Sequence, residues 1–191
     1  MKKILAILLF ICSFLGFSFA EKEVKVYSKS MKKDIPVTVI LPDGYSKDKS
    51  YNTIYVLHGW SGSNKNYPEK TSIKKLSDQY DIIYVSPDGN YDSWYVDSNL
   101  KKDSKYYTFV SKELVDYIDS NFSTYKAKEH RAITGLSMGG FGAFYIGIKN
   151  QDVFGNIGSM SGGMNPEQYR GNWGIEKVIN SDWNEYNIKD I

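Results

Sequence analysis

Residues 131–143 read RAITGLSMGGFGA, a short apolar run that leads into a glycine-rich turn and a second apolar stretch. The turn contains G-x-S-x-G, with Gly135 and Gly139 on either side of Ser137. Between a predicted strand and a predicted helix, such a serine occupies a sharp, strained turn that lifts its hydroxyl above the sheet. Side chains at the two glycines would collide with the strand and the helix. Ser137 is therefore predicted to be a nucleophile, and the alternative is a chance turn.

Two backbone N–H groups are predicted to stabilise negative charge beside Ser137. Met138 begins the predicted helix, so its N–H points toward the place where an oxyanion would form. The second donor is expected in the loop after residues 53–57, where Gly59 lets the backbone approach and Trp60 offers its backbone N–H. The alternative for this loop is a simple turn that ends a strand.

The segments around these motifs predict alternating strands and helices. Runs rich in β-branched and aromatic residues indicate strands at 24–27, 35–41, 53–57, 82–86, 131–135 and 156–160. Helices are predicted in the gaps, at about 71–80, 105–120 and 138–149, with Ser104 as the N-cap of the second. The first two strands are expected to form a hairpin-like edge. The others predict an α/β fold, a mostly parallel sheet with helices on both faces, whose ligands bind beyond the carboxyl ends of the strands.

The first 20 residues have the pattern of a secretory signal peptide. Lys2 and Lys3 precede an apolar run that ends at Phe17, and small residues lead to a predicted cleavage site after Ala20. This run is shorter than the ~20 residues that cross a bilayer, so we expect a secreted or periplasmic protein without stable membrane insertion after cleavage. The one cysteine, Cys12, lies in the run, which leaves the mature part without a disulfide or a thiolate metal site.

The mature part, residues 21–191, is predicted to be one domain with almost no net charge. Without Lys2 and Lys3 the 24 Lys and Arg fall to 22, which equals the 22 Asp and Glu. This balance does not favour a nucleic-acid partner or an acidic ligand. The length suits a single domain with a substantial core, and the oligomeric state is left open.

A cluster of aromatic and acidic residues follows the predicted strand 82–86, at the same edge of the sheet as Ser137. Together with His58, the residues Trp94, Tyr95 and Asp97 are candidates for the wall of a substrate pocket. Trp94 and Tyr95 also fit core positions, with Asp97 as an acceptor that holds a loop. The sequence favours this second, structural interpretation.

Taken together, these segments resemble the putative esterase family of α/β hydrolases over about residues 24–163. The resemblance lies in Leu57-His58-Gly59, in residues 88–97 and 131–143, and in Gly158-Ser159-Met160-Ser161-Gly162. That family includes tributyrin esterases, S-formylglutathione hydrolases, enterochelin-esterase-like and feruloyl esterases, and the mycolyl transferases. The resemblance implies an α/β-hydrolase that cleaves small-molecule or carbohydrate carboxylic esters through an acyl-enzyme, with no cofactor and no metal.

The sequence departs from this family in its catalytic base. A serine hydroxyl needs a histidine to take its proton and a carboxylate to orient that histidine, and in this fold both follow the serine. No histidine follows Ser137, and an extended strand of about 23 Å separates His130 from it. The resemblance assigns His58 to shaping the oxyanion loop, with service as a substitute base as the alternative.

The family places its acid after the next strand and its histidine after the last one. The six predicted strands end before either position, and Asp152, Asp182 and Asp190 do not match the position of the acid. We therefore expect the chain to be the N-terminal portion of the esterase domain, without its last two strands, its triad acid or its triad histidine.

Three functions are compatible with the sequence. The leading one is a secreted serine esterase; the second is an acyltransferase of the mycolyl-transferase type, in which an alcohol replaces water. The third is a non-catalytic ligand-binding remnant that holds a sugar or aryl group on Trp60, Tyr67, Tyr91 and Trp94. The missing histidine favours the remnant, whereas the intact serine turn argues against it.

Overall fold

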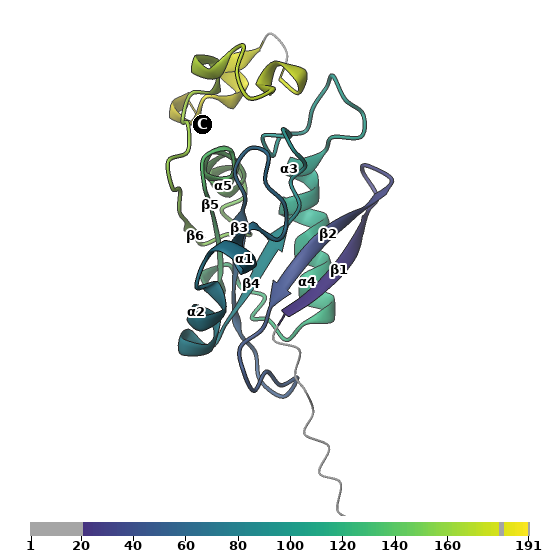
Figure 1. Ribbon diagram of the computed structural model, residues 1–191, viewed down its shortest axis with the longest axis vertical. Helices are drawn as coiled ribbons and strands as arrows, with labels where there is room; N and C mark the ends of the chain where they lie inside the picture. Colours follow the sequence, from purple (N-terminus) through teal and green to yellow (C-terminus); the bar gives the residue numbers. More distant parts are fainter. Residues whose placement is uncertain (1–20, 180–181, 191) are drawn as a thin grey trace, which may run out of the picture.

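A six-stranded sheet forms the centre of the chain, with strand order β1-β2-β4-β3-β5-β6 (Figure 1). The computed structural model describes residues 21–179 and 182–190, so the predicted signal peptide lies outside the described residues. The strands are β1 (Glu21–Ser28), β2 (Lys33–Ile40), β3 (Asn52–Leu57), β4 (Ile82–Pro87), β5 (Arg131–Gly135) and β6 (Asn156–Ile157). Each of the six segments predicted as a strand therefore overlaps one observed strand.

The sheet is antiparallel at one edge and parallel elsewhere. β1 pairs with β2 and β2 with β4 in antiparallel register, which confirms the hairpin-like edge. The pairs β4 with β3, β3 with β5, and β5 with β6 are parallel. Because parallel strands present their carboxyl ends at one edge, the loops after β3, β4 and β5 meet there.

Helices cover both faces of the sheet, as the alternation of strands and helices predicts. The helical segments before β6 are α1 (Asn66–Lys70), α2 (Ile73–Tyr80), α3 (Tyr106–Thr108), the π-helical turn η1 (Phe109–Glu113), α4 (Leu114–Asn121), the 3-10 turn η2 (Lys128–His130) and α5 (Met138–Lys149). Tyr55 and Leu57 of β3 pack in the large core with α4 and α5. Val56, between them, packs on the other face with Ile73 of α2. This period of two is what a sheet buried on both faces requires.

The structure corrects the local predictions at three points. The helix predicted at 105–120 contains the π-helical turn η1. Its N-cap is Lys105 and not Ser104. The buried hydroxyl of Ser104 has no hydrogen-bond partner in the described part of the chain. Strand β6 is two residues long, although an isolated bridge between Leu136 and Met160 continues its direction. Helix α1 was not predicted, because five residues are too few to show a helical period.

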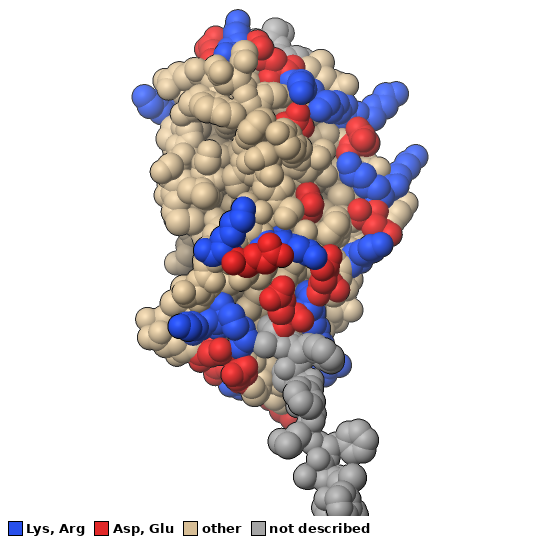
Figure 2. All heavy atoms as spheres, viewed as in Figure 1, with Lys and Arg blue, Asp and Glu red and all other residues tan. Residues whose placement is uncertain are grey.

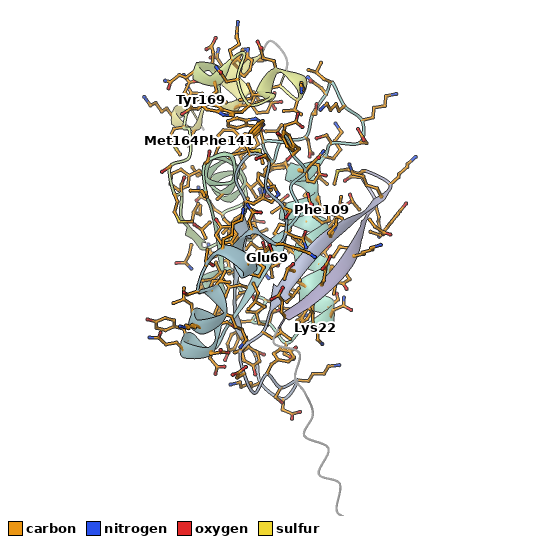
Figure 3. The ribbon with its side chains drawn as sticks, viewed as in Figure 1. Lys22, Glu69, Phe109, Phe141, Met164 and Tyr169 are labelled. Carbon is orange, nitrogen blue, oxygen red and sulfur yellow. The ribbon has the colours of Figure 1, made fainter. Side chains whose placement is uncertain are left out.

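Short 3-10 helices follow β6 and pack beyond the carboxyl ends of the strands, at the top of Figure 1. They are η3 (Pro166–Tyr169), η4 (Ile175–Lys177), η5 (Trp183–Tyr186) and η6 (Ile188–Asp190). Trp94 anchors this segment: its indole stacks on Tyr169 and donates to the carbonyl oxygen of Trp173 at 3.1 Å. Figure 3 shows Tyr169 and Met164 near Phe141 of α5, whose ring also contacts Trp94.

In the parts of the chain that the structure describes, no helix has the length and apolar character needed to cross a bilayer. Figure 2 shows acidic and basic side chains interleaved over the face seen there, with a broad uncharged area at the height of α5.

Candidate active site

Ser137 stands at the junction of β5 and α5 in a backbone conformation that serine rarely adopts. Its φ is 55° and its ψ −115°, outside the regions that L-residues normally occupy. Its N–H donates to the carbonyl oxygen of Met160 at 2.8 Å, and its own carbonyl oxygen accepts from Phe141 N–H at 2.9 Å. These two bonds hold the turn from both sides, and the Ser137 side chain remains exposed.

Two glycines make this turn sterically possible. A Cβ atom on Gly135 would lie 2.3 Å from the carbonyl oxygen of Gly139, and one on Gly139 would lie 2.0 Å from the carbonyl oxygen of Leu57. Real Cβ atoms do not approach backbone so closely, and a backbone neighbour cannot rotate away. Gly135 and Gly139 are therefore required because β3, β5 and the start of α5 come into backbone contact at these two positions.

The loop after β3 lies directly beside the serine. A Cβ atom on Gly59 would stand 3.6 Å from Ser137 Cβ and 3.3 Å from the carbonyl oxygen of Leu136. In the described part of the chain the N–H of Trp60 donates to no protein acceptor, and Met138 N–H has none because Met138 is the first residue of α5. Two N–H groups are thus available next to Ser137, as an oxyanion hole requires.

Both ring nitrogens of His58 form hydrogen bonds with the backbone. Its Nδ1 lies 2.7 Å from the carbonyl oxygen of Gly59, and its Nε2 accepts from Gly89 N–H at 2.7 Å. Since Gly89 N–H can only donate, Nε2 carries no proton and Nδ1 donates to Gly59. Burial lowers the pKa of His58, because the charged form is poorly solvated there. His58 therefore joins the β3 and β4 loops and has no free nitrogen with which to take a proton from Ser137.

Tyr95 and Trp94 lie in the interior. Tyr95 is fully buried, donates its hydroxyl to the His58 carbonyl oxygen at 3.2 Å, and packs so closely on Gly89 and Gly142 that neither could carry a side chain. Trp94 is 3% exposed, and both residues have positive φ. Asp97 accepts from the N–H and the hydroxyl of Thr108 and so fixes the start of the following helix. These three contacts match the structural interpretation, not the pocket wall.

The contact between Gly89 and His58 is the feature that sequence reasoning missed. Gly89 reads as an ordinary turn residue between Asp88 and Asn90. Its N–H meets His58 only because β3 and β4 are neighbours in the sheet. The close approach of the Tyr95 ring to Gly89 is likewise visible only in the fold, so the sequence carried no signal for this contact.

A family model described as "Putative esterase" matches residues 28–189. The chain belongs to this family. Esterase Rv1288 of Mycobacterium tuberculosis is 33% identical to it over 144 residues, which cover 73% of this chain and 31% of that protein. The acetyl esterase of Caldicellulosiruptor saccharolyticus is 31% identical over 147 residues, covering 73% of this chain and 54% of that enzyme. The chain thus spans between about a third and about half of the curated relatives it matches.

The fold agrees with this membership. An S-formylglutathione hydrolase from Agrobacterium tumefaciens superposes with a TM-score of 0.79 at 21% identity, over 89% of this chain and 69% of that structure. At this identity the similarity concerns the fold, which is that of the α/β-hydrolase esterases. The predicted fold class and family are confirmed.

Neither histidine of this esterase-family chain lies in the position of a catalytic base. His130 is at the start of β5, the opposite end of the strand from Ser137, where its Nδ1 lies 2.7 Å from Asn52 Oδ1 and its ring stacks on Tyr125. Among the described residues no group of three or more His, Cys, Asp or Glu is arranged to hold a metal ion.

A small hollow of about 100 Å³ opens beside the serine turn, on the face covered by α1. It lies between His58, Gly59 and Leu136 on one side and Asn66, Tyr67 and Lys70 on the other. Tyr67, one of the lining residues, donates its hydroxyl to the Leu57 carbonyl oxygen at 3.2 Å, and burial raises the pKa of Tyr67 to about 12. The hydroxyl thus stays protonated and keeps its hydrogen bond to β3.

Proposed function

We propose that this chain carries the nucleophile and the oxyanion hole of a secreted serine esterase that cleaves carboxylic esters through an acyl-enzyme. The observation that carries the proposal is the left-handed backbone of Ser137 next to two N–H groups without protein acceptors. A strained residue costs about 1–3 kcal/mol and persists where the surrounding structure and function require it. Membership of an esterase family supports the same chemistry.

In the proposed reaction Ser137 Oγ attacks the ester carbonyl carbon while a base takes its proton. The carbonyl oxygen becomes an oxyanion that accepts hydrogen bonds from the N–H groups of Trp60 and Met138. The bond to the alcohol then breaks and the alcohol leaves with a proton. Water attacks the acyl-serine in the same way, which releases the acid and restores the hydroxyl. One such oxyanion donor typically contributes about 10²- to 10³-fold in rate.

Neither of the two histidines in the sequence is placed to be the base of this reaction. His58 is engaged through both nitrogens, and His130 lies at the far end of β5. We propose that a histidine and its carboxylate partner come from a part of the protein that this sequence does not contain. The partial coverage of the curated relatives supports this view.

Chemical rescue tests the proposal in the 191-residue chain. Imidazole in solution can act as the missing base, so hydrolysis of p-nitrophenyl acetate that depends on Ser137 should rise with imidazole concentration. Ser137→Ala is the matched control, since it retains the hydrolysis that imidazole performs by itself. Equal rates for the two chains at every imidazole concentration, together with no labelling of Ser137 by a fluorophosphonate in the presence of imidazole, would refute the nucleophile.

Export is a separate part of the proposal. The signal peptide predicts that the mature chain begins at Glu21. Mass spectrometry of the protein recovered outside the cytoplasm should find Glu21 at the N-terminus, and an intact Met1 in that fraction would contradict the prediction.

A further inference from the structure

Two exposed aromatic side chains touch each other next to the Ser137 site. Trp60 follows β3 and Tyr91 follows β4; their ring centroids are 4.7 Å apart at an interplanar angle of 68°. Trp60 is 37% exposed and Tyr91 53% exposed. The pair is therefore packed edge to face while each ring still presents surface to solvent, where a flat ligand can reach it.

Hydrogen bonds hold the two loops in place without a ligand. Ser61 N–H donates to the Tyr91 carbonyl oxygen at 2.9 Å and so joins the loops directly. Within the β4 loop, Asn90 N–H donates to Asp88 Oδ1 at 2.6 Å and Tyr91 N–H to Asn90 Oδ1 at 2.7 Å. Because these loops are already ordered, a ligand that binds the rings loses little free energy to ordering them.

The pair stands within reach of the serine. Trp60 directly follows Gly59, whose backbone lies against Ser137. In the strand order, β4 and β3 lie on one side of β5 and β6 lies on the other. Trp60 and Tyr91 thus form the rim on the β4 side of Ser137, away from the β6 edge.

Several polar side-chain atoms of the two loops already form hydrogen bonds within the loops. Asp88 and Asn90 accept backbone N–H groups, as described above. Ser63 Oγ accepts from Lys65 N–H and Asn66 Oδ1 from Ser63 N–H, and the Lys65 ammonium pairs with Glu23 at 3.2 Å. A planar aromatic ring can stack on, or pack edge to face against, the two exposed rings without a polar partner from these loops.

We propose that the Trp60–Tyr91 pair is a binding platform for an aromatic ring of the ester substrate. The four aromatics that the sequence suggested for ligand binding are thereby reduced to two, since Trp94 is buried and Tyr67 holds the Leu57 carbonyl oxygen. This proposal rests on the proposed function in one respect: the ligand of the platform is the ester that Ser137 cleaves.

Binding of an uncleavable ligand tests the platform without relying on catalysis. trans-Cinnamamide carries an aromatic ring, 3-cyclohexylpropanamide has a saturated ring of similar size, and methyl β-xyloside represents a sugar. Ligand-observed NMR titration of the 191-residue chain should show that cinnamamide binds about tenfold more tightly than either comparison compound. Equal affinity for the cyclohexyl compound, or tighter binding of the xyloside, would overturn the proposal.

Substitutions of Trp60 and Tyr91 test whether these two residues form the binding site. Tyr91→Leu and Trp60→Leu leave the backbone groups in place and should each weaken cinnamamide binding by about tenfold. Tyr27→Leu is the matched control, because Tyr27 is 57% exposed on β1 and should not affect binding. Unchanged affinity in Tyr91→Leu, or an equal loss in Tyr27→Leu, would contradict the assignment.

The Ser137→Ala variant separates this proposal from the esterase proposal. It should bind cinnamamide as the unaltered chain does, because the platform does not include the hydroxyl. Selective binding in a chain whose Ser137 stays inert to fluorophosphonate even in the presence of imidazole would retain the platform and remove the nucleophile. Labelling of Ser137 without selective cinnamamide binding would do the reverse.

Discussion

Gly89 N–H donates to His58 Nε2 over 2.7 Å, and this bond joins the loop that follows β4 to the loop that carries the proposed oxyanion donor. His58 completes the connection by holding the Gly59 carbonyl oxygen. Because the imidazole has one donor and one acceptor in its neutral form, the arrangement requires a neutral ring. Protonation would turn Nε2 into a donor facing another donor.

The stability of the chain should therefore fall in mild acid through His58. Burial lowers the pKa of His58 in the folded chain, so the unfolded chain takes up the proton first as the pH falls below about 6.5. The unfolding free energy contributed by this residue is fully present above that pH and is lost as the pH falls toward the folded-state pKa.

Urea unfolding between pH 7 and pH 5 measures this contribution. His58→Gln can keep both hydrogen bonds without titrating, so its unfolding free energy should decline less than that of the unaltered chain. His130→Gln serves as the control for the removal of a histidine far from this hydrogen bond. A His58→Gln chain with an unchanged slope would show that His58 does not cause the effect.

Strain at Ser137 predicts different stabilities for two substitutions. Ser137→Gly should be more stable than Ser137→Ala by about 1–2 kcal/mol, since glycine tolerates φ 55° and alanine does not. Both should abolish turnover that depends on Ser137. Urea midpoints at equal m-values test the difference, and equal midpoints would mean that the turn is not strained.

Because Gly139 lies against β3, the addition of a single methyl group at this position should destabilise the fold strongly. Gly139→Ala would place a Cβ atom 2.0 Å from the Leu57 carbonyl oxygen, so we expect destabilisation of about 3 kcal/mol or more. In the control Gly158→Ala, the nearest atom is the Thr134 hydroxyl at 3.1 Å, and the cost should be about 1 kcal/mol. Similar unfolding free energies for both variants would contradict the observed approach.

A buried ion pair holds the start of β5. Arg131 lies 2.6 Å from Asp119, with side chains 4% and 15% exposed, and also donates to the Val153 carbonyl oxygen. Asp119→Asn should cost about 3–5 kcal/mol because it leaves the Arg131 charge buried without its partner. Asp81→Asn, which breaks the exposed pair with Lys49, should cost much less, because solvent screens the two charges. Equal losses in urea unfolding would show that burial does not distinguish the two pairs.

The residues whose role depends on neighbours along the chain could be predicted from the sequence. Helix α5 begins at Met138, as predicted, and the glycines at 135 and 139 make the contacts that the turn motif requires. The π-helical turn at Phe109–Glu113 could not be predicted, because its apolar spacing resembles that of an α-helix.

The sequence by itself determined the fold class, the family and the candidate nucleophile, because a serine turn between strand and helix is defined by consecutive residues and their steric limits. Tertiary structure decided which aromatics are available to a ligand: Trp94 and Tyr95 are interior, whereas Trp60 and Tyr91 are exposed and in contact. It also decided that His58 is a neutral bridge between loops and not a base. Burial and hydrogen bonding depend on which loops the strand order brings together, and β3 and β4 are neighbours only in the folded sheet.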